Sequence, residues 1–345
     1  MTTHSFGFDS VLVTVRADDR RFDEVVSRLA QDFENFTRAQ ETVSTVEINV
    51  TLSSASDEVT GGWGKTRLTP RYRFFPRVCD HGGGTTSKIR RRGDRISVSV
   101  SGRDVDHVYE IAYVAILSIL GWELEKLGFV RLHALGIGEN GRATLFQLPP
   151  RGGKSTLALE CLRNEFDVLG DEIVLVRSQR VHAFPIRIAV AATVARQFSA
   201  HSREFSRKTF DRKSLLSFEK RKGEPLELGT LVFQSKPGIA TEVAPASAFN
   251  SLEWVAWTCL GLGLPQMREF ILRLEELPWV IVVALRRLGF ALKFLSTRRL
   301  LVSRTLVTGD PAGLMPRLAW VRSSIETVRV HEAPILRRSE SSETT

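Results

Sequence analysis

The chain has few cysteines for its 345 residues, and its amino terminus lacks an export signal. The first ten residues, MTTHSFGFDS, have neither the basic start nor the apolar run of a secretory signal. The cysteines are far apart and odd in number, which argues against a disulfide framework and against a zinc cluster. These absences predict a cytoplasmic protein. The three cysteines are Cys79, Cys161 and Cys259.

Long apolar runs are also missing from the sequence. A membrane-spanning helix needs about 20 mostly apolar residues. The stretch from Ile111 to Trp122 is too short, and the stretch from Trp279 to Leu295 is interrupted by three basic residues. Both are predicted to be buried or amphipathic helices, so no transmembrane segment is expected. A helix that lies on a membrane surface around Val283 to Phe294 stays open.

The composition is that of a globular protein with an excess of positive charge. Apolar residues make up 43% and charged residues 25%, and the length allows two domains. Lysine and arginine exceed aspartate and glutamate by 48 to 39, which gives a net charge of +9. This charge favours anionic partners such as nucleotides, acidic peptides, nucleic acid or a membrane face. Nucleic acid is not expected, because basic and aromatic residues are not interleaved and no DNA-reading helix is recognisable.

The first 128 residues predict a mainly antiparallel sheet with two helices. A long apolar helix should begin at Asp104 or Asp106, whose side chain can cap it, and end near Leu127 before Gly128. The glycine-rich segment from Asp80 to Thr86 is predicted to be a turn. Alternating apolar residues predict strands at Val11–Arg16, Val46–Leu52, Tyr72–Val78 and Arg95–Val100, and helical spacing predicts a helix at Arg21–Phe33.

The middle of the chain predicts a strand, a glycine-bearing loop and a helix in succession. Strands are expected at Val130–Ile137 and Ala143–Leu148, joined at Asn140 and Gly141 because Asn-Gly adopts positive φ angles at low cost. Helical spacing begins directly after Gly153. Further expected elements are a strand with an acidic interruption at Asp167–Val176, a strand pair at Gln179–Ile188, a helix at Ala192–Ser206, a strand at Leu231–Gln234, helices beyond Pro245 and a strand at Leu300–Val307.

The segment LPPRGGKST contains the end of the phosphate-binding pattern GxxxxGK[ST]. In this pattern glycine lets backbone amides approach phosphate oxygens, lysine neutralises their charge, and the hydroxyl binds magnesium. Gly153, Lys154 and Ser155 match these three places. The first glycine of the pattern is replaced by Leu148, and two prolines remove amide donors from the loop.

Two further features lie on either side of this loop. Asp171 comes sixteen positions after Ser155 and is followed by Glu172, in the apolar context VLGDEIVLV. Carboxylates among buried residues are costly unless they meet a metal, a cation or a proton-transfer task, although a turn that begins at Gly170 would also explain them. Upstream, His133 lies in the strand that leads toward the loop, where it is either structural or catalytic.

Together these residues resemble the HPr serine kinase/phosphorylase family and its relatives. That family has a strand with His-Gly, a hairpin, a GK[ST] loop with its helix, and an Asp-Asp pair about sixteen residues later. The similar stretch runs from Val130 to Ile188, with a weaker echo at Leu228–Phe233. Here Ala134 stands in place of the glycine and Glu172 in place of the second aspartate. A later glycine-rich segment associated with phosphorolysis is not found, which favours kinase activity over the reverse reaction.

The resemblance implies ATP and Mg²⁺ as cofactors and assigns roles to individual residues. Lys154 would hold the β and γ phosphates, and Ser155 and Glu172 would bind the metal. Asp171 would be the base that accepts the proton of the attacking hydroxyl, and His133 would lie near the γ phosphate. The implied nucleotide-binding residues are Arg151, Gly152, Gly153, Lys154, Ser155 and Thr156.

The expected fold class is therefore α/β with α+β elements. It comprises a P-loop kinase core of the HPr kinase/PEP carboxykinase type, a mainly antiparallel N-terminal extension and a helical C-terminal part. The expected division is a substrate-recognition region at 1–128, the kinase core at 129–245, a mainly helical region at 246–336 and a disordered tail at 337–345.

The predicted function is transfer of the ATP γ-phosphate to a hydroxyl of a protein or a ribosomally made peptide. Relatives of the family include lasso-peptide kinases that modify a serine, and the positive charge suits an acidic substrate. Two alternatives stay open: a nucleotide-binding partner protein without catalysis, and a small-molecule kinase of the same fold. Formation of a homo-oligomer also stays open.

Overall fold

The computed structural model is a mixed α/β protein of the α+β kind with two mixed sheets. It describes residues 2–38, 44–54, 78–148, 154–163, 166–191, 213–216, 224–234, 239–271, 273–297 and 300–305. The chain divides into two compact units. The first unit contains Met1–Arg131, Pro185–Glu219 and Leu264–Arg286, and the second contains Leu132–Phe184, Lys220–Gly263 and Arg287–Thr345.

These units are assembled from separate stretches of sequence, whereas the expected regions were continuous. The expected division at 1–128, 129–245 and 246–336 stays a prediction. Three expected segments lie outside the described residues: most of the strand at Tyr72–Val78, the helix at Ala192–Ser206 and the tail at 337–345.

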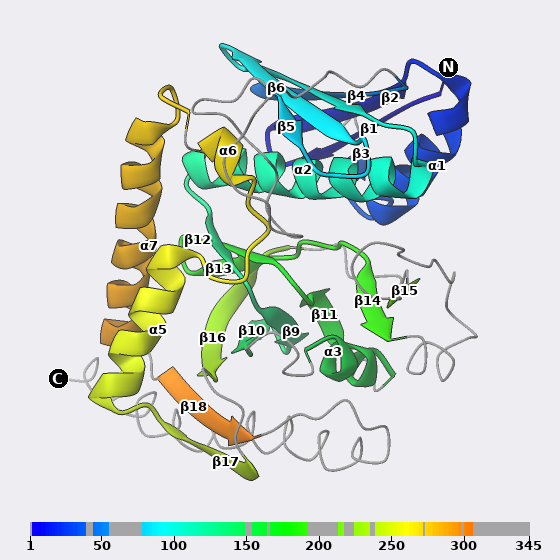
Figure 1. Ribbon diagram of the computed structural model, residues 1–345. Helices are drawn as coiled ribbons and strands as arrows, with labels where there is room; N and C mark the ends of the chain where they lie inside the picture. Colours follow the sequence, from blue (N-terminus) through cyan, green and yellow to red (C-terminus); the bar gives the residue numbers. More distant parts are fainter. Residues whose placement is uncertain are drawn as a thin grey trace, which may run out of the picture. The chain divides into compact units, whose positions relative to one another are not determined.

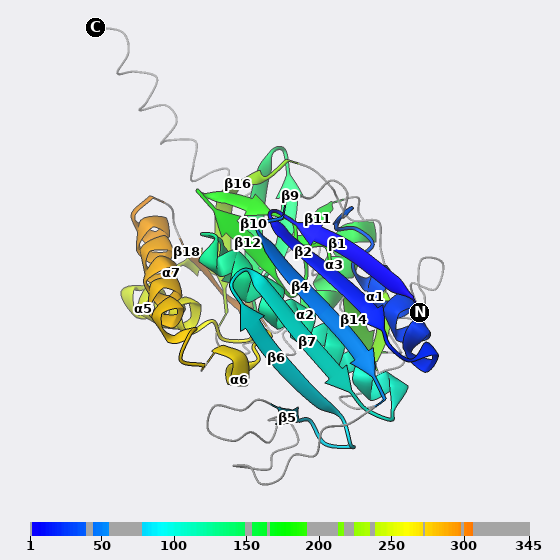
Figure 2. The same ribbon diagram turned by 90° about the horizontal axis from the view of Figure 1, so that it is seen from above.

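The first unit contains a seven-stranded sheet in the order β3-β1-β2-β4-β7-β6-β5 (Figure 1 and, from above, Figure 2). Alternate residues of its strands are buried, as the valines of β2 illustrate. The strands are β1 (Thr3–Phe8), β2 (Val11–Ala17), β3 (Thr37–Arg38), β4 (Val46–Ser53), β5 (Cys79–Asp80), β6 (Thr86–Arg92) and β7 (Arg95–Ser101).

The first sheet is mainly antiparallel, as expected, but its centre is parallel. There β4 pairs in parallel with both β2 and β7. The physical reason is the connection between β2 and β4, since it contains helix α1 (Asp23–Asp32) and is long enough to bring the chain back in the same direction. Hairpin pairs between β1 and β2 and between β6 and β7 surround this parallel centre.

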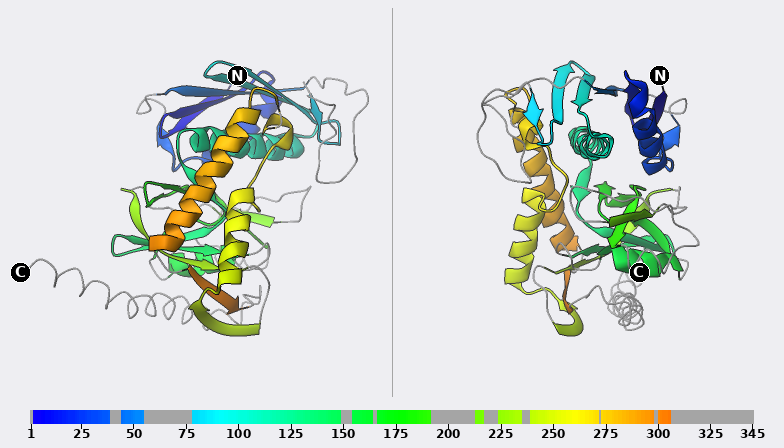
Figure 3. Two further views of the ribbon diagram at one scale, coloured as in Figure 1. Left: turned by 90° about the vertical axis from the view of Figure 1, so that its left-hand side faces the viewer. Right: turned by 45° about the vertical axis from the view of Figure 1, so that its right-hand side comes forward.

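Helix α2 (Val105–Lys126) packs with α1 on one face of the first sheet, as the views in Figures 1 and 3 agree. The Asp104 side chain accepts hydrogen bonds from the amides of Asp106 and His107, which confirms the predicted cap, and Gly128 has a φ of 98° after the helix. Among the described helices α2 alone has the length and hydropathy of a membrane span, and 83% of that window is buried inside the protein. Such burial is what a core helix has.

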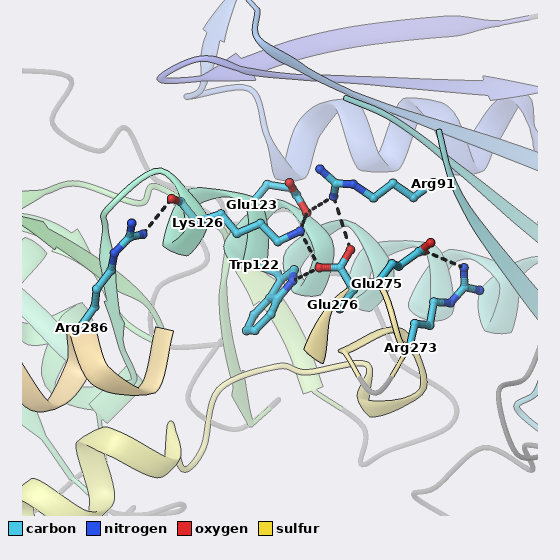
Figure 4. Close-up of polar contacts among 8 residues, drawn as sticks. All are labelled: Arg91, Trp122, Glu123, Lys126, Arg273, Glu275, Glu276 and Arg286. Atoms are coloured by element: carbon cyan, nitrogen blue, oxygen red, sulfur yellow. Dashed lines mark hydrogen bonds and ion pairs between the residues drawn. The ribbon is translucent and has the colours of Figure 1, made fainter. Parts of the chain in front are cut away.

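A buried charge cluster attaches the segment before α7 to the first unit (Figure 4). The Glu276 carboxylate accepts hydrogen bonds from Trp122 Nε1 at 2.8 Å and from Arg91 Nη1 at 3.5 Å. It also lies 2.5 Å from Lys126 Nζ. Glu123 contacts the same two cations, at 2.7 Å from Arg91 and 3.0 Å from Lys126. Each buried carboxylate therefore has two cationic partners.

The second sheet has nine strands. Seven follow the order β11-β9-β10-β16-β13-β12-β8, β18 pairs in parallel with β16, and β17 pairs with β18. The strands are β8 (Val130–Leu132), β9 (Leu135–Glu139), β10 (Arg142–Gln147), β11 (Asp167–Gly170), β12 (Val174–Arg177), β13 (Arg180–His182), β16 (Leu226–Phe233), β17 (Ile239–Pro245) and β18 (Leu300–Thr305). A separate strand pair, β14 (Ile188–Ala191) and β15 (Lys213–Leu216), belongs to the first unit.

The predicted hairpin between β9 and β10 is confirmed, with Asn140 at φ 50° and Gly141 at φ 79°. Helix α3 (Lys154–Arg163) begins where helical spacing resumes. Helices α5 (Ala248–Leu260) and α7 (Leu277–Thr297) confirm the helical character beyond Pro245, with the short α6 (Arg268–Ile271) between them.

Candidate functional site

The pairing of β10 and β11 with β9 brings the predicted site residues to the same end of these three strands of the second sheet. Strands β10 and β11 both pair antiparallel with β9, so they run in the same direction on its two sides. Their carboxyl ends therefore lie at the edge where β9 begins. The register agrees, because Gly136 of β9 is opposite both Leu145 of β10 and Gly170 of β11. The chain leaves β10 toward the glycine loop and leaves β11 at Asp171, and it enters β9 just after His133.

Lys154 is the first residue of α3 and is 8% exposed. Its Nζ donates a hydrogen bond to the carbonyl oxygen of Leu148, at 2.8 Å, across the base of the glycine loop. Burial lowers the pKa of Lys154 from 10.5 to about 8, although the charges of Glu172 and Asp171 act in the opposite direction. A buried ammonium group is thus placed at the start of a helix, within electrostatic reach of two carboxylates.

The acidic pair lies in a bend between two strands. A single strand over Asp167–Val176 was expected, but β11 ends at Gly170 and β12 begins at Val174, elsewhere in the sheet. Gly170 permits this bend, because a Cβ atom there would lie only 2.3 Å from the Ile173 carbonyl oxygen. Asp171 is fully buried and Glu172 is half-buried. The turn that begins at Gly170 therefore exists, and it carries the acidic pair to the sheet edge.

His133 contacts the acidic bend through its ring. Its Nδ1 lies 2.9 Å from the carbonyl oxygen of Glu172, so Nδ1 carries the proton and donates it to this bond. Burial and then the positive charge of Lys154 lower the pKa of His133 to about 3. The ring is therefore neutral at physiological pH, and its Nε2 can only accept a hydrogen bond.

Two contacts at this edge were not predicted from the sequence. Gly263 has a φ of 81° and lies so close to His133 that a Cβ atom there would be 2.5 Å from the ring. On the other side, Trp254 Nε1 of α5 donates to the Gln147 side-chain oxygen, 2.5 Å away, at the last residue of β10. The pattern Gly-Leu-Gly after a helical stretch signals a helix end, and Gly261 is the left-handed cap of α5. The sequence pattern predicts the end of the helix, but it does not indicate which side chains lie next to Gly261 and Gly263.

The remaining predicted nucleotide-binding residues are described only in part. Arg151, Gly152 and Gly153 lie outside the described residues. Ser155 is half-buried in the first turn of α3, and Thr156 belongs to the same turn, although its side chain is outside the described part.

The groups at this edge have complementary chemistry for phosphate and metal. The amino end of α3 and the Lys154 ammonium attract anions. The Glu172 carboxylate and the Ser155 hydroxyl are oxygen donors of the kind Mg²⁺ uses, and Mg²⁺ is usually held by one or two carboxylates together with substrate phosphates. Within the described residues no group of three or more His, Cys, Asp or Glu could hold a metal by itself. Comparison of the chain with protein-family models and with curated proteins gives no match.

Proposed function

We propose that the chain is an ATP-dependent phosphotransferase that moves the γ-phosphate to a hydroxyl group, with a P-loop kinase core formed by the second unit. The observation that carries the proposal is the position of the buried Lys154 at the start of α3, where the charges of Glu172 and Asp171 act on its ammonium group. A lysine with so unfavourable an environment is expected at a functional site more than in a structural core.

In the proposed site Lys154 binds the phosphates of the nucleotide, and the first turn of α3 supplies amide donors and the positive end of its dipole. Glu172 and Ser155 would hold Mg²⁺, which would neutralise charge on the phosphate oxygens when bound with ATP. The loop residues Arg151 to Gly153 would enclose the triphosphate.

Asp171 accepts the proton of the acceptor hydroxyl in this proposal. A bond forms between the acceptor oxygen and the γ phosphorus while the bond from that phosphorus to the β,γ-bridging oxygen breaks, and ADP leaves. The proton of the hydroxyl goes to the Asp171 carboxylate.

His133 has a positioning role in the proposed reaction. Because its ring is neutral and its Nδ1 holds the Glu172 carbonyl, it fixes the acidic bend and adds no charge beside Lys154. This role differs from charge stabilisation of the γ phosphate, for which a protonated imidazole would be needed.

The proposed acceptor is a serine of a protein or of a ribosomally made peptide. The test is incubation of the purified chain with ATP, Mg²⁺ and candidate peptides encoded beside its gene, followed by mass spectrometry. A gain of one phosphate on a serine supports both the reaction and the acceptor. Phosphorylation of a small molecule alone would place the chain among small-molecule kinases.

The role of Asp171 is tested separately with a matched pair of variants. Asp171→Asn should lower transfer by roughly 10²-fold or more while ATP binding is kept, because only proton transfer is removed. Asp167→Asn, at the other end of β11, should transfer like the wild type. Full activity in Asp171→Asn would refute its assignment as the base. ATP binding without turnover in the wild type would favour a non-catalytic nucleotide-binding partner.

A further inference from the structure

The exposed apolar side chains of this protein are concentrated in one part of the sequence. Ten large apolar residues are exposed in the described chain, and all ten lie between residues 249 and 292. Soluble surfaces carry isolated apolar residues, but a contiguous group marks a surface that contacts a partner or a membrane. The ten are Phe249, Leu252, Leu260, Leu262, Leu274, Leu277, Trp279, Ile281, Leu285 and Leu292.

On α7 these residues form a stripe along the side opposite the buried face. Ile281, Leu285 and Leu292 are 64%, 61% and 56% exposed, and their spacing of four and seven residues puts them on one side of a helix. The buried side consists of other residues, including Phe290 and Phe294, which contact Trp254 of α5. The exposed stripe of α7 is therefore additional to its core contacts.

Helix α5 carries a second stripe of the same kind. Phe249, Leu252 and Leu260 are exposed, and Ala256 lies between them at helical spacing. Trp254, on the opposite side of α5, is fully buried. Both helices thus use one side for the core and leave an apolar side exposed.

Polar contacts fix the orientation of α7, so its apolar stripe cannot simply turn inward. Arg286 Nη1 donates to the carbonyl oxygens of Glu125 and Lys126 at the end of α2, both at 2.7 Å. Figure 4 shows the bond to Lys126. Arg287 Nη1, the next residue, donates to the Cys259 carbonyl at the end of α5, at 3.4 Å. Rotation of α7 would break these bonds to two helix ends.

The charge pattern of α7 selects the kind of partner. Helix α7 contains three basic residues and no acidic residue, and two of the three, Arg286 and Arg287, donate hydrogen bonds to backbone carbonyl oxygens. Of these, Lys293 is exposed beside Leu292. Two copies of the chain joined through α7 would bring like charges together, which is unfavourable. An anionic bilayer instead offers hydrocarbon for the stripe and negative headgroups for Lys293.

We propose that α7 binds the surface of an anionic lipid bilayer. This helix lies in the interface, with Ile281, Leu285 and Leu292 directed into the hydrocarbon boundary. This inference does not depend on the proposed phosphotransferase activity.

The test uses the full-length protein and two kinds of vesicle, one of phosphatidylcholine and one of phosphatidylcholine with phosphatidylglycerol. The protein should float with the anionic vesicles and bind less at high salt. The triple variant Ile281→Gln, Leu285→Gln, Leu292→Gln should bind about 1,000-fold more weakly, since each of the three buried aliphatic side chains contributes roughly tenfold. Lys293→Gln should weaken binding about fivefold.

Control measurements distinguish loss of membrane binding from misfolding and from damage to the proposed nucleotide site. Gln31→Asn, at an exposed position of α1, should bind vesicles like the wild type. Circular dichroism and ATP binding of the triple variant should match the wild type, because the three side chains are exposed.

Absence of wild-type binding to anionic vesicles would overturn the proposal, as would unchanged binding by the triple variant. A wild-type dimer that dissociates in the triple variant, without vesicle binding, would assign the surface to a second copy of the chain and would also overturn it.

Discussion

Replacement of Lys154 with methionine should change protein stability in a pH-dependent way. In the folded protein burial lowers the pKa of Lys154 from 10.5 to about 8, despite the nearby Glu172 and Asp171 carboxylates. At pH 7 the folded wild type therefore carries a charge whose burial costs free energy. The methionine variant lacks this charge. Removal of the buried charge should therefore raise its free energy of unfolding at neutral pH.

The size and sign of the effect follow from the two pKa values. Between about pH 8 and pH 10.5 the unfolded chain keeps the Lys154 proton and the folded chain has lost it, so wild-type stability rises with pH in this window. At about 1.4 kcal/mol per pH unit the full difference is about 3 kcal/mol, of which about 2 kcal/mol falls between pH 7 and pH 9.5. Loss of the hydrogen bond to Leu148, worth about 1 kcal/mol, lowers the variant's stability at every pH.

Urea unfolding at pH 7 and pH 9.5 measures this effect. The wild type should gain about 2 kcal/mol relative to Lys154→Met over this range. Lys293→Met, at an exposed position of α7, should differ from the wild type by the same amount at both pH values. An equal stability difference between the wild type and Lys154→Met at both pH values would refute the buried, charge-penalised lysine.

Two further substitutions test contacts around the site and within the first unit. Gly263→Ala should lower phosphate transfer with the fold retained, because its Cβ atom would displace the His133 ring. Gly289→Ala is the control, because Gly289 lies in open space on α7. It should leave transfer unchanged and raise the free energy of unfolding by roughly 0.5–1 kcal/mol. Glu276→Gln should lower the free energy of unfolding by about 1–3 kcal/mol, because it removes one of the two carboxylates that pair with Arg91 and Lys126 and leaves Glu123 as the other. Glu275→Gln, whose exposed carboxylate lies 3.9 Å from Arg273, should cost less than about 1 kcal/mol by urea unfolding.

Local features of the fold were predictable from the sequence because they depend on neighbouring residues. Asp104 capped a long apolar helix as expected, and Asn140 with Gly141 formed the hairpin. In both cases a single backbone requirement selects the residue type. The strand predicted at Leu300 is also confirmed, because its apolar run is a signal carried by neighbouring residues.

Pairing between distant strands was not predictable in this way. The parallel pairs of β4 involve strands with ordinary alternating patterns, which do not indicate direction. The convergence of His133, Lys154 and Asp171 depends on β9 lying between β10 and β11, and no single stretch of sequence contains that order. Motif spacing suggested that these residues act together, whereas the bend at Gly170 and the contact of Gly263 with His133 required the structure.

The most direct test of the account is calorimetry of Mg-ATP binding at pH 8.5 in buffers of different ionisation enthalpy. Phosphates beside Lys154 should restore its charge, so wild-type binding should take up a proton. Lys154→Arg should bind without this uptake, since arginine stays protonated. Lys154→Met should bind on the order of 100-fold more weakly. Wild-type binding that involves no proton uptake, or that Lys154→Met reproduces in full, would contradict a triphosphate site at Lys154.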